Sequence, residues 1–147
     1  MTKFTFITFG KVKSANLHEL VSYYNTLLGK YIKTEIRILK DVEGRPIEIA
    51  DINTSFRDLG YTVAVTEHGR DFDTEGLKFF VDKRFRYENS VTFIIGNAFG
   101  LDPAFMQRCD FSLALSKLTF PHEMALVILL EQLYRVLNMT NGGSYHK

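Results

Sequence analysis

Segments with the composition of β-strands alternate with segments of helical periodicity along most of the chain. The strand-like segments are rich in β-branched and aromatic residues and lie at 3–9, 31–39, 61–66, 91–95 and 111–115. The helical segments carry apolar residues three or four positions apart and lie at 14–28, 74–86, 103–108 and 121–139. Because strands and helices alternate, the sequence predicts an α/β fold with a mostly parallel sheet flanked by helices.

Residues at the segment ends support these boundaries. Asn16 and Glu19 have capping-box spacing, Asp73 is expected to cap the helix at 74–86, and Asp102 is expected to begin a helix with Pro103 at its first position. We expect the second helix to bury its apolar face, which consists of Leu77, Phe80, Val81 and Phe85. The charged alternation at 31–39 is typical of a half-exposed strand near a sheet edge, and 41–58 is expected to be a loop with one short helix.

The last helical segment, 121–139, has no polar face in its first half, which contains the apolar run 124–130. Such a helix should be buried, and the run is far too short to cross a bilayer. At 147 residues, one domain spanning 1–147 is expected, with little room for a second core, so the sequence predicts that this helix also forms a homodimer interface. No membrane association is expected.

Charge and cysteine content narrow the classes of function. The net charge is +1, so no overall basic excess indicates a nucleic-acid-binding protein, although residues 1–40 hold seven Lys or Arg against two acids. Cys109 is the sole cysteine, which excludes an intrachain disulfide. The N-terminal apolar stretch is too short for a signal peptide. These features predict a cytoplasmic protein.

Residues 96–101, Gly-Asn-Ala-Phe-Gly-Leu, follow a buried strand. Ligands of parallel sheets bind at the carboxyl ends of strands, so this loop could approach a ligand, or it could be an ordinary turn that needs glycine dihedrals. No two of the four histidines have metal-ligand spacing, so no metal site is expected. The basic cluster at 83–86 is typical of a solvated helix end, and no serine has the context of a hydrolase nucleophile.

The ordered motifs of the second half resemble one family. "FIIGNAFGL" at 93–101, "FSLALSKLTFPH" at 111–122, "LLEQLYRV" at 129–136 and the final "YHK" match the ribosomal RNA large subunit methyltransferase H family, whose members are SPOUT-class enzymes. "FGKVK" at 9–13 and "GRDFDTEGL" at 69–77 match it as well. The resemblance implies a C-terminal trefoil knot, a homodimer, and S-adenosylmethionine-dependent methylation of N3 of a pseudouridine in large-subunit (23S) ribosomal RNA within the ribosome.

The resemblance also implies site residues. Those expected to bind the cofactor are Val65, Gly96, Leu115, Ser116, Lys117, Leu118, Thr119 and Phe120. Those expected to bind substrate or act in catalysis are His122, Tyr145, His146 and Lys147. The acceptor nitrogen must lose a proton, and histidine is the side chain suited to take one near neutral pH, so His122 and His146 are both candidate bases.

Four positions depart from the family pattern. Asn97 stands where a second glycine is usual, Leu126 where an arginine is common, and Val65-Thr66 where a leucine and an acid are frequent. Two alternatives to this methyltransferase stay open, and the first is motivated by Asn97 and Leu126. The chain could be a catalytically inactive SPOUT protein that binds RNA or assists ribosome assembly, or a different nucleotide-binding α/β enzyme.

Overall fold

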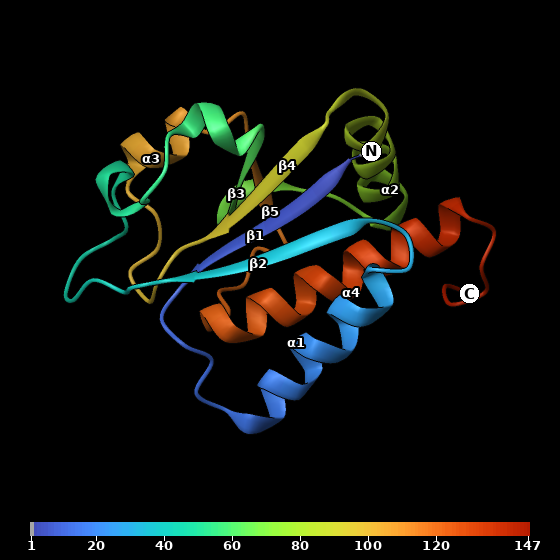
Figure 1. The fold of residues 1–147 in the computed structure, drawn as a ribbon, viewed down its shortest axis with the longest axis horizontal. Coiled ribbons are helices and arrows are strands. Elements are labelled where there is room, and N and C mark those ends of the chain that lie inside the picture. Colours follow the sequence, from blue (N-terminus) through green and yellow to red (C-terminus); the bar gives the residue numbers. More distant parts are fainter. Residues whose placement is uncertain (1) are drawn as a thin grey trace.

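A computed structural model describes residues 2–147 and contains one five-stranded sheet (Figure 1). Its strands are β1 (Lys3–Phe9), β2 (Lys33–Leu39), β3 (Tyr61–Asp71), β4 (Ser90–Ile95) and β5 (Phe111–Ala114). They lie in the order β2-β1-β4-β3-β5, and every neighbouring pair is parallel. The α/β class and the parallel sheet are therefore confirmed, and β2 is an edge strand as expected.

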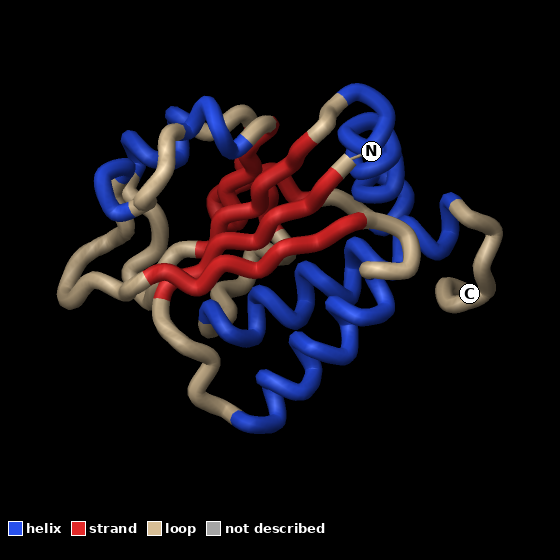
Figure 2. The backbone as a smooth tube through the Cα atoms, viewed as in Figure 1, coloured by secondary structure: helices blue, strands red, loops and turns tan. Residues whose placement is uncertain are grey.

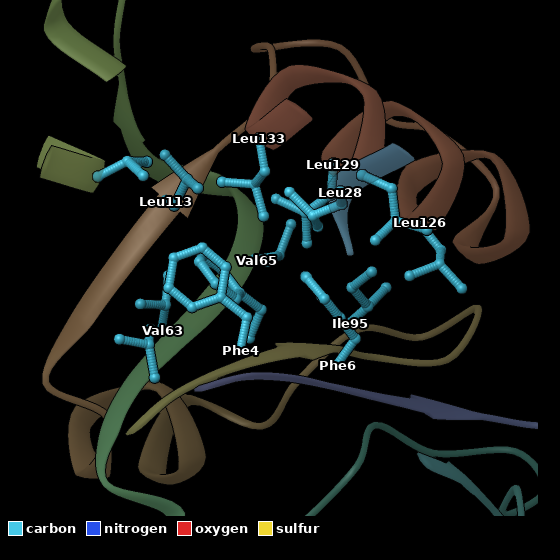
Figure 3. Packing of buried hydrophobic residues seen from close by; sticks show 14 of the residues in the cluster. Phe4, Phe6, Leu28, Val63, Val65, Ile95, Leu113, Leu126, Leu129 and Leu133 are labelled. Carbon is cyan, nitrogen blue, oxygen red and sulfur yellow. The ribbon is translucent and has the colours of Figure 1, made fainter. Parts of the chain in front are cut away.

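Each central strand is apolar on both faces because helical layers cover both sides of the sheet. In β1, Phe4 and Phe6 belong to one core, whereas Ile7 and Phe9 belong to a second core on the opposite face. Strand side chains alternate between faces, so a continuous apolar run supplies both cores at once. The first core is the larger, and its side chains converge between the sheet and the helix above it (Figure 3).

Three long helices pack on the first face, and short helices cover the second (Figures 1 and 2). The long helices are α1 (Ala15–Leu28), α2 (Thr74–Tyr87) and α4 (His122–Thr140). The second face carries α3 (Pro103–Arg108) and two 3-10 helices, Ile49–Asp51 and Phe56–Leu59. Among the described residues, none of the helices combines the length and the apolar character that crossing a bilayer would take.

Helix α4 is buried along the apolar run, as its sequence predicts. Leu126, Leu129 and Leu130 are almost fully buried, whereas Met124 at the start of the run remains 37% exposed. The expectation that the chain lacks room for a second core is wrong, because the cluster on the other face is a core of its own. Most of the apolar run therefore packs inside its own chain.

Other local expectations need correction. The cap of α1 is Ser14, whose hydroxyl accepts a hydrogen bond from the Leu17 amide, and Asn16 lies within the first turn instead. Phe85 was expected to face inward but is 39% exposed, because the buried stripe of α2 ends at Val81. The loop at 41–58 holds two short helices rather than one, and β3 continues to Asp71 past a bulge after Val65.

Candidate active site at the carboxyl ends of the strands

A cavity of about 460 Å³ opens where the pairing of β3 with β4 ends. Three chain segments and the start of α4 form its walls. They are the end of the paired part of β3, the loop after β4 and the loop after β5. The lining residues are Val65, Thr66, Glu67, Ile95, Gly96, Asn97, Ala98, Phe99, Gly100, Leu101, Leu115, Ser116, Leu118, Thr119, Phe120, Pro121, His122 and Ala125.

Most of the residues expected to bind the cofactor lie around this cavity. Seven of them line it: Val65, Gly96, Leu115, Ser116, Leu118, Thr119 and Phe120. Lys117 does not line it, and its side chain is exposed to solvent. Of the residues expected to act in catalysis, His122 lines the cavity, and Tyr145, His146 and Lys147 do not.

The loop after β4 depends on two glycines for different reasons. A Cβ on Gly96 would lie 2.6 Å from the carbonyl carbon of Gly100 and 2.8 Å from its oxygen, which is closer than real contacts allow. Gly100 itself has a φ of +84°, a left-handed conformation that other residues adopt only at a cost. The loop therefore folds tightly on itself. The glycine-dependent turn is confirmed, and the loop also borders the cavity.

Asn97 joins this loop to the segment before the first 3-10 helix. Its buried amide nitrogen donates to a carboxylate oxygen of Asp41 and to the carbonyl of Arg45, both at 3.0 Å. Its amide oxygen accepts a hydrogen bond of 3.0 Å from the Phe99 amide. Asn97 has no positive φ, so its position does not require glycine. The departure from the family pattern thus adds a tie between two loops.

We expect Asn97→Ala to lower the free energy of unfolding by roughly 1–3 kcal/mol, since buried groups lose their hydrogen-bond partners. Denaturant unfolding followed by circular dichroism would measure this change. Asn16→Ala is the matched control, because Asn16 is exposed and makes no cap, and it should cost well under 1 kcal/mol. Equal effects of the two substitutions would show that Asn97 does not hold the loops together.

The loop after β5 leads directly into α4. Within it, the Ser116 hydroxyl accepts a hydrogen bond from the Leu118 amide at 3.0 Å. Helix α4 begins at His122 after Pro121, and its N-cap provides no side chain that accepts a hydrogen bond from the first amides. The Nε2 atom of His122 is buried and has no hydrogen-bond partner among residues 2–147. Buried polar atoms without a partner are uncommon in folded proteins.

Glu67 is the acidic side chain at the cavity, and the sequence reasoning missed it. An acid was expected one position earlier, where Thr66 stands. Strand β3 does not end at Thr66 but continues to Asp71, and Glu67 lies in the irregular stretch between Val65 and Arg70 that borders the cavity. Residues 2–147 form no cluster of three or more His, Cys, Asp or Glu side chains that could hold a metal ion.

The C-terminal tail packs against the last half of its own α4 (Figure 2). The Tyr145 hydroxyl donates a 2.6 Å hydrogen bond to Glu131, and its amide donates to Asn138 at 3.1 Å. Arg135 donates to Nδ1 of His146 at 3.0 Å. Arg135 lies thirteen residues after His122, which is roughly 20 Å along the helix. Within one chain the tail and the cavity are therefore well separated.

Tyr145 is held in its protonated form. Burial raises the pKa of Tyr145, and its hydrogen bond to the Glu131 carboxylate raises the pKa further. This phenol therefore acts as a hydrogen-bond donor near neutral pH and not as a base. Its ring also packs against Tyr134, with ring centroids 4.8 Å apart, which orders the tail.

Comparison with known proteins first gives the class. The family model described as "Predicted SPOUT methyltransferase" matches residues 2–146. In structure, the chain is similar to the tRNA (m1G37) methyltransferase of Aquifex aeolicus, with a TM-score of 0.58 and 12% identity over 99% of this chain and 74% of that one. A methylase family protein of Haemophilus influenzae gives the same score and identity, over 99% and 70% of the two chains. The fold, the cavity and the family match define a SPOUT methyltransferase.

Sequence relatives narrow the class. The chain is 35% identical to the ribosomal RNA large subunit methyltransferase H of Bifidobacterium adolescentis, over 99% of both chains. It is 34% identical to the protein of the same name from Clostridium acetobutylicum, over 97% of this chain and 98% of that one. The chain belongs to the ribosomal RNA large subunit methyltransferase H family.

Proposed function

We propose that the protein transfers a methyl group from S-adenosylmethionine to N3 of a pseudouridine in large-subunit (23S) ribosomal RNA, on the assembled ribosome. The observation that carries this proposal is the nearly full-length match to relatives named as ribosomal RNA large subunit methyltransferases. The cavity adds support, because seven of the eight residues expected to bind the cofactor line it. Residues 1–147 would act as one SPOUT domain.

The residues at the cavity fit S-adenosylmethionine. A volume of about 460 Å³ lies in the range of small-molecule sites. Glu67 supplies a negative charge for a cationic sulfonium, and the apolar walls of Val65, Ile95 and Leu115 suit an adenine ring. When bound, the cofactor would supply an activated methyl group, so the protein's task is mainly to position the acceptor.

The acceptor nitrogen must lose its proton, and His122 is the better placed of the two histidines in one chain. His122 lines the cavity, whereas Nδ1 of His146 accepts a hydrogen bond from Arg135 on the far half of α4. We propose His122 as the group that accepts the proton or orients a water that does. Tyr145, His146 and Lys147 would bind the RNA, by stacking, hydrogen bonding and phosphate pairing respectively.

A homodimer would bring the C-terminal tail of one subunit to the cavity, lined by His122, of the other. Since the tail cannot reach its own cavity from where it packs, both can serve one site only if the tail belongs to a second subunit. Exposed apolar side chains on the neighbouring helices α1 and α4 support such an interface, namely Leu20, Tyr23 and Met124. The buried remainder of the apolar run does not contribute, because it packs inside its own chain.

Light scattering at micromolar concentration should therefore report twice the mass of one chain. A second measurement mixes two inactive variants, His122→Ala and one lacking residues 145–147. If the tail serves the partner's cavity, mixed dimers carry one intact site and regain part of the activity. A monomeric mass, or no recovery in mixtures shown to exchange subunits, would contradict the shared site.

We also propose that the segment from β5 into α4 is threaded as a trefoil knot. The family implies this topology, and the structural similarity to the Aquifex aeolicus enzyme supports it. The two loops that would form the knot, after β4 and after β5, border the same cavity. Knotted chains are rare, so this site would be built from an unusual crossing of the backbone.

Two measurements test the proposed function. Calorimetry with S-adenosylmethionine should show binding, and labelled methyl groups should enter whole ribosomes faster than naked ribosomal RNA. Binding without transfer would favour the inactive RNA-binding alternative, and no binding would reject both. Of the two positions that motivated this alternative, Leu126 is buried in the core, and Asn97 lines the cavity while its side chain bonds to Asp41 and Arg45.

A further inference from the structure

One face of α2 carries aromatic and cationic side chains that folding does not use. We define the α2 stripe as Phe79, Lys83, Arg86 and Tyr87. At 100° per residue these four positions fall within about 100° of one another around the helix, and they span roughly 12 Å along it. All four are exposed, and the two aromatic side chains are among the most exposed large residues of the described chain, at 73% for Phe79 and 65% for Tyr87.

Several other side chains of this helix have partners. Leu77, Phe80 and Val81 are buried in the core. The Arg84 guanidinium lies over the rings of Tyr61 and Phe80, 4.4 and 5.3 Å from their centroids, so it packs along the protein. Lys78 pairs with Asp82 at 2.9 Å.

The stripe's own cations are left without such partners. Neither Lys83 nor Arg86 forms an ion pair within residues 2–147. The Arg86 guanidinium lies 6.0 Å from the Tyr87 ring centroid, so a cation and an aromatic face are presented together. Exposed aromatic groups cost free energy in water, and gathered on one face they indicate a surface that is covered when a partner binds.

Charge and chemistry indicate what covers it. Residues 78–87 hold four Lys or Arg against one acid, which makes this helix basic in a chain whose net charge is only +1. Protein interfaces are depleted in lysine at their centres. Aromatic rings interspersed with lysine and arginine instead match unpaired RNA, whose bases stack on rings and whose phosphates pair with cations.

The position of the stripe agrees with this chemistry. The Thr140 hydroxyl in the last turn of α4 donates a 2.6 Å hydrogen bond to Asp82 of α2. Helix α2 therefore lies beside the place where the C-terminal tail begins. Figure 1 shows α2 at the same end of the molecule as the C-terminal turn of α4. An RNA strand that contacts the tail could thus extend onto α2.

We propose that the α2 stripe is an RNA-binding surface outside the methyl-transfer site, with Phe79 and Tyr87 stacking on unpaired bases and Lys83 and Arg86 pairing with phosphates. This inference rests on the proposed function only in taking RNA as the substrate. The role of the α2 stripe would be to hold the ribosomal substrate. Changes to the stripe should therefore affect substrate affinity and leave the chemical step unchanged.

The test uses two double variants, Phe79→Ala/Tyr87→Ala and Lys83→Gln/Arg86→Gln. Each should raise KM for ribosomes at least about fivefold with kcat unchanged. The aromatic variant loses stacked bases, each of which contributes a factor of about 5 or more, and the charge variant loses two phosphate contacts. The charge variant should also flatten the salt dependence of ribosome cosedimentation by roughly 0.7–0.9 per lost phosphate contact. Calorimetry should show unchanged affinity for S-adenosylmethionine.

Matched controls separate the stripe from general effects. Lys30→Gln/Arg57→Gln removes the same charge at exposed positions elsewhere, and Phe85→Ala removes an exposed aromatic from α2 on another side. Both controls should bind ribosomes like the wild type. Loss of binding in the charge control equal to that in the stripe variant would overturn the proposal, because net charge alone would then explain it.

Binding of a 12-nucleotide polyuridine RNA, followed by fluorescence anisotropy at low salt, needs no methylation. Weaker RNA binding by both stripe variants supports the inference even if the wild type methylates nothing, in which case only the proposed function fails. Unchanged RNA binding and ribosome KM overturn the inference and leave the proposed function standing. Lost ribosome binding with unchanged RNA binding and salt dependence would indicate a protein partner and would likewise overturn it.

Discussion

Deleting residues 145–147 should reduce methyl transfer to ribosomes by about 10²-fold or more, because the three side chains that would bind and position the RNA are lost together. Cofactor affinity should change little, because none of the three residues lines the cavity. The fold should persist as well, since Asn141 ends α4 before the tail begins and Tyr145 is partly exposed. Methyl incorporation into whole ribosomes, beside calorimetry with S-adenosylmethionine, measures both effects.

Single substitutions then apportion the loss. His122→Ala should abolish transfer with cofactor binding largely kept if His122 handles the proton, and His146→Ala should then mainly raise KM for ribosomes. Tyr145→Phe keeps the ring and removes the hydroxyl that donates to Glu131, so it tests the ordering of the tail. Wild-type transfer by the deleted protein would show that the tail is ordinary terminal sequence.

Gly96→Val should eliminate cofactor binding. The wild-type protein gains about 2.7 kcal/mol of stability when ligand is present at 100 times Kd, and the variant should gain none. The reason is the backbone of the loop itself: a Cβ on Gly96 would collide with Gly100, so the loop must open before any ligand arrives. Thermal unfolding with and without millimolar S-adenosylmethionine measures the difference.

Gly44→Ala is the control for this substitution. Gly44 also adopts a positive φ, of +74°, but a Cβ there meets nothing within 4 Å, and Gly44 does not line the cavity. Gly44→Ala should lose some stability and keep the full ligand-induced shift. A Gly96→Val protein that is still stabilised by the ligand would mean that the loop after β4 does not bind it.

The elements that could be predicted are those whose caps, breaks or apolar pattern lie within a few neighbouring residues. Asp102 and Pro103 begin α3 where expected, and Asp73 caps α2 through the Gly76 amide. Strand β4 was predicted to within one residue, because its apolar run is bounded by a glycine. Burial of α4 also followed from its composition, since a helix without a polar face must be covered.

What could not be predicted depends on contacts between distant segments. β3 extends beyond its apolar part because β5 pairs with it on both sides of a bulge, and nothing in "EHGRD" announces that pairing. Whether Lys117 lines the cavity depends on the path of a loop. The position of the tail on α4 depends on hydrogen bonds from Tyr145 to Asn138 and Glu131. The resemblance indicated which residues form a site without showing that some lie far apart in one chain.

The position of β1 inside the sheet, between β2 and β4, has a consequence for folding during synthesis. β1 pairs with β2 on one side, but its other edge pairs with β4, so that Lys3 lies beside Ser90. A ribosome adding 5–20 residues per second needs on the order of 10 s to reach β4 after completing β1. During that interval the growing chain displays a phenylalanine-rich strand with an open edge, which is a template for aggregation. We therefore expect translation speed and early chaperone contact to affect the yield of this protein.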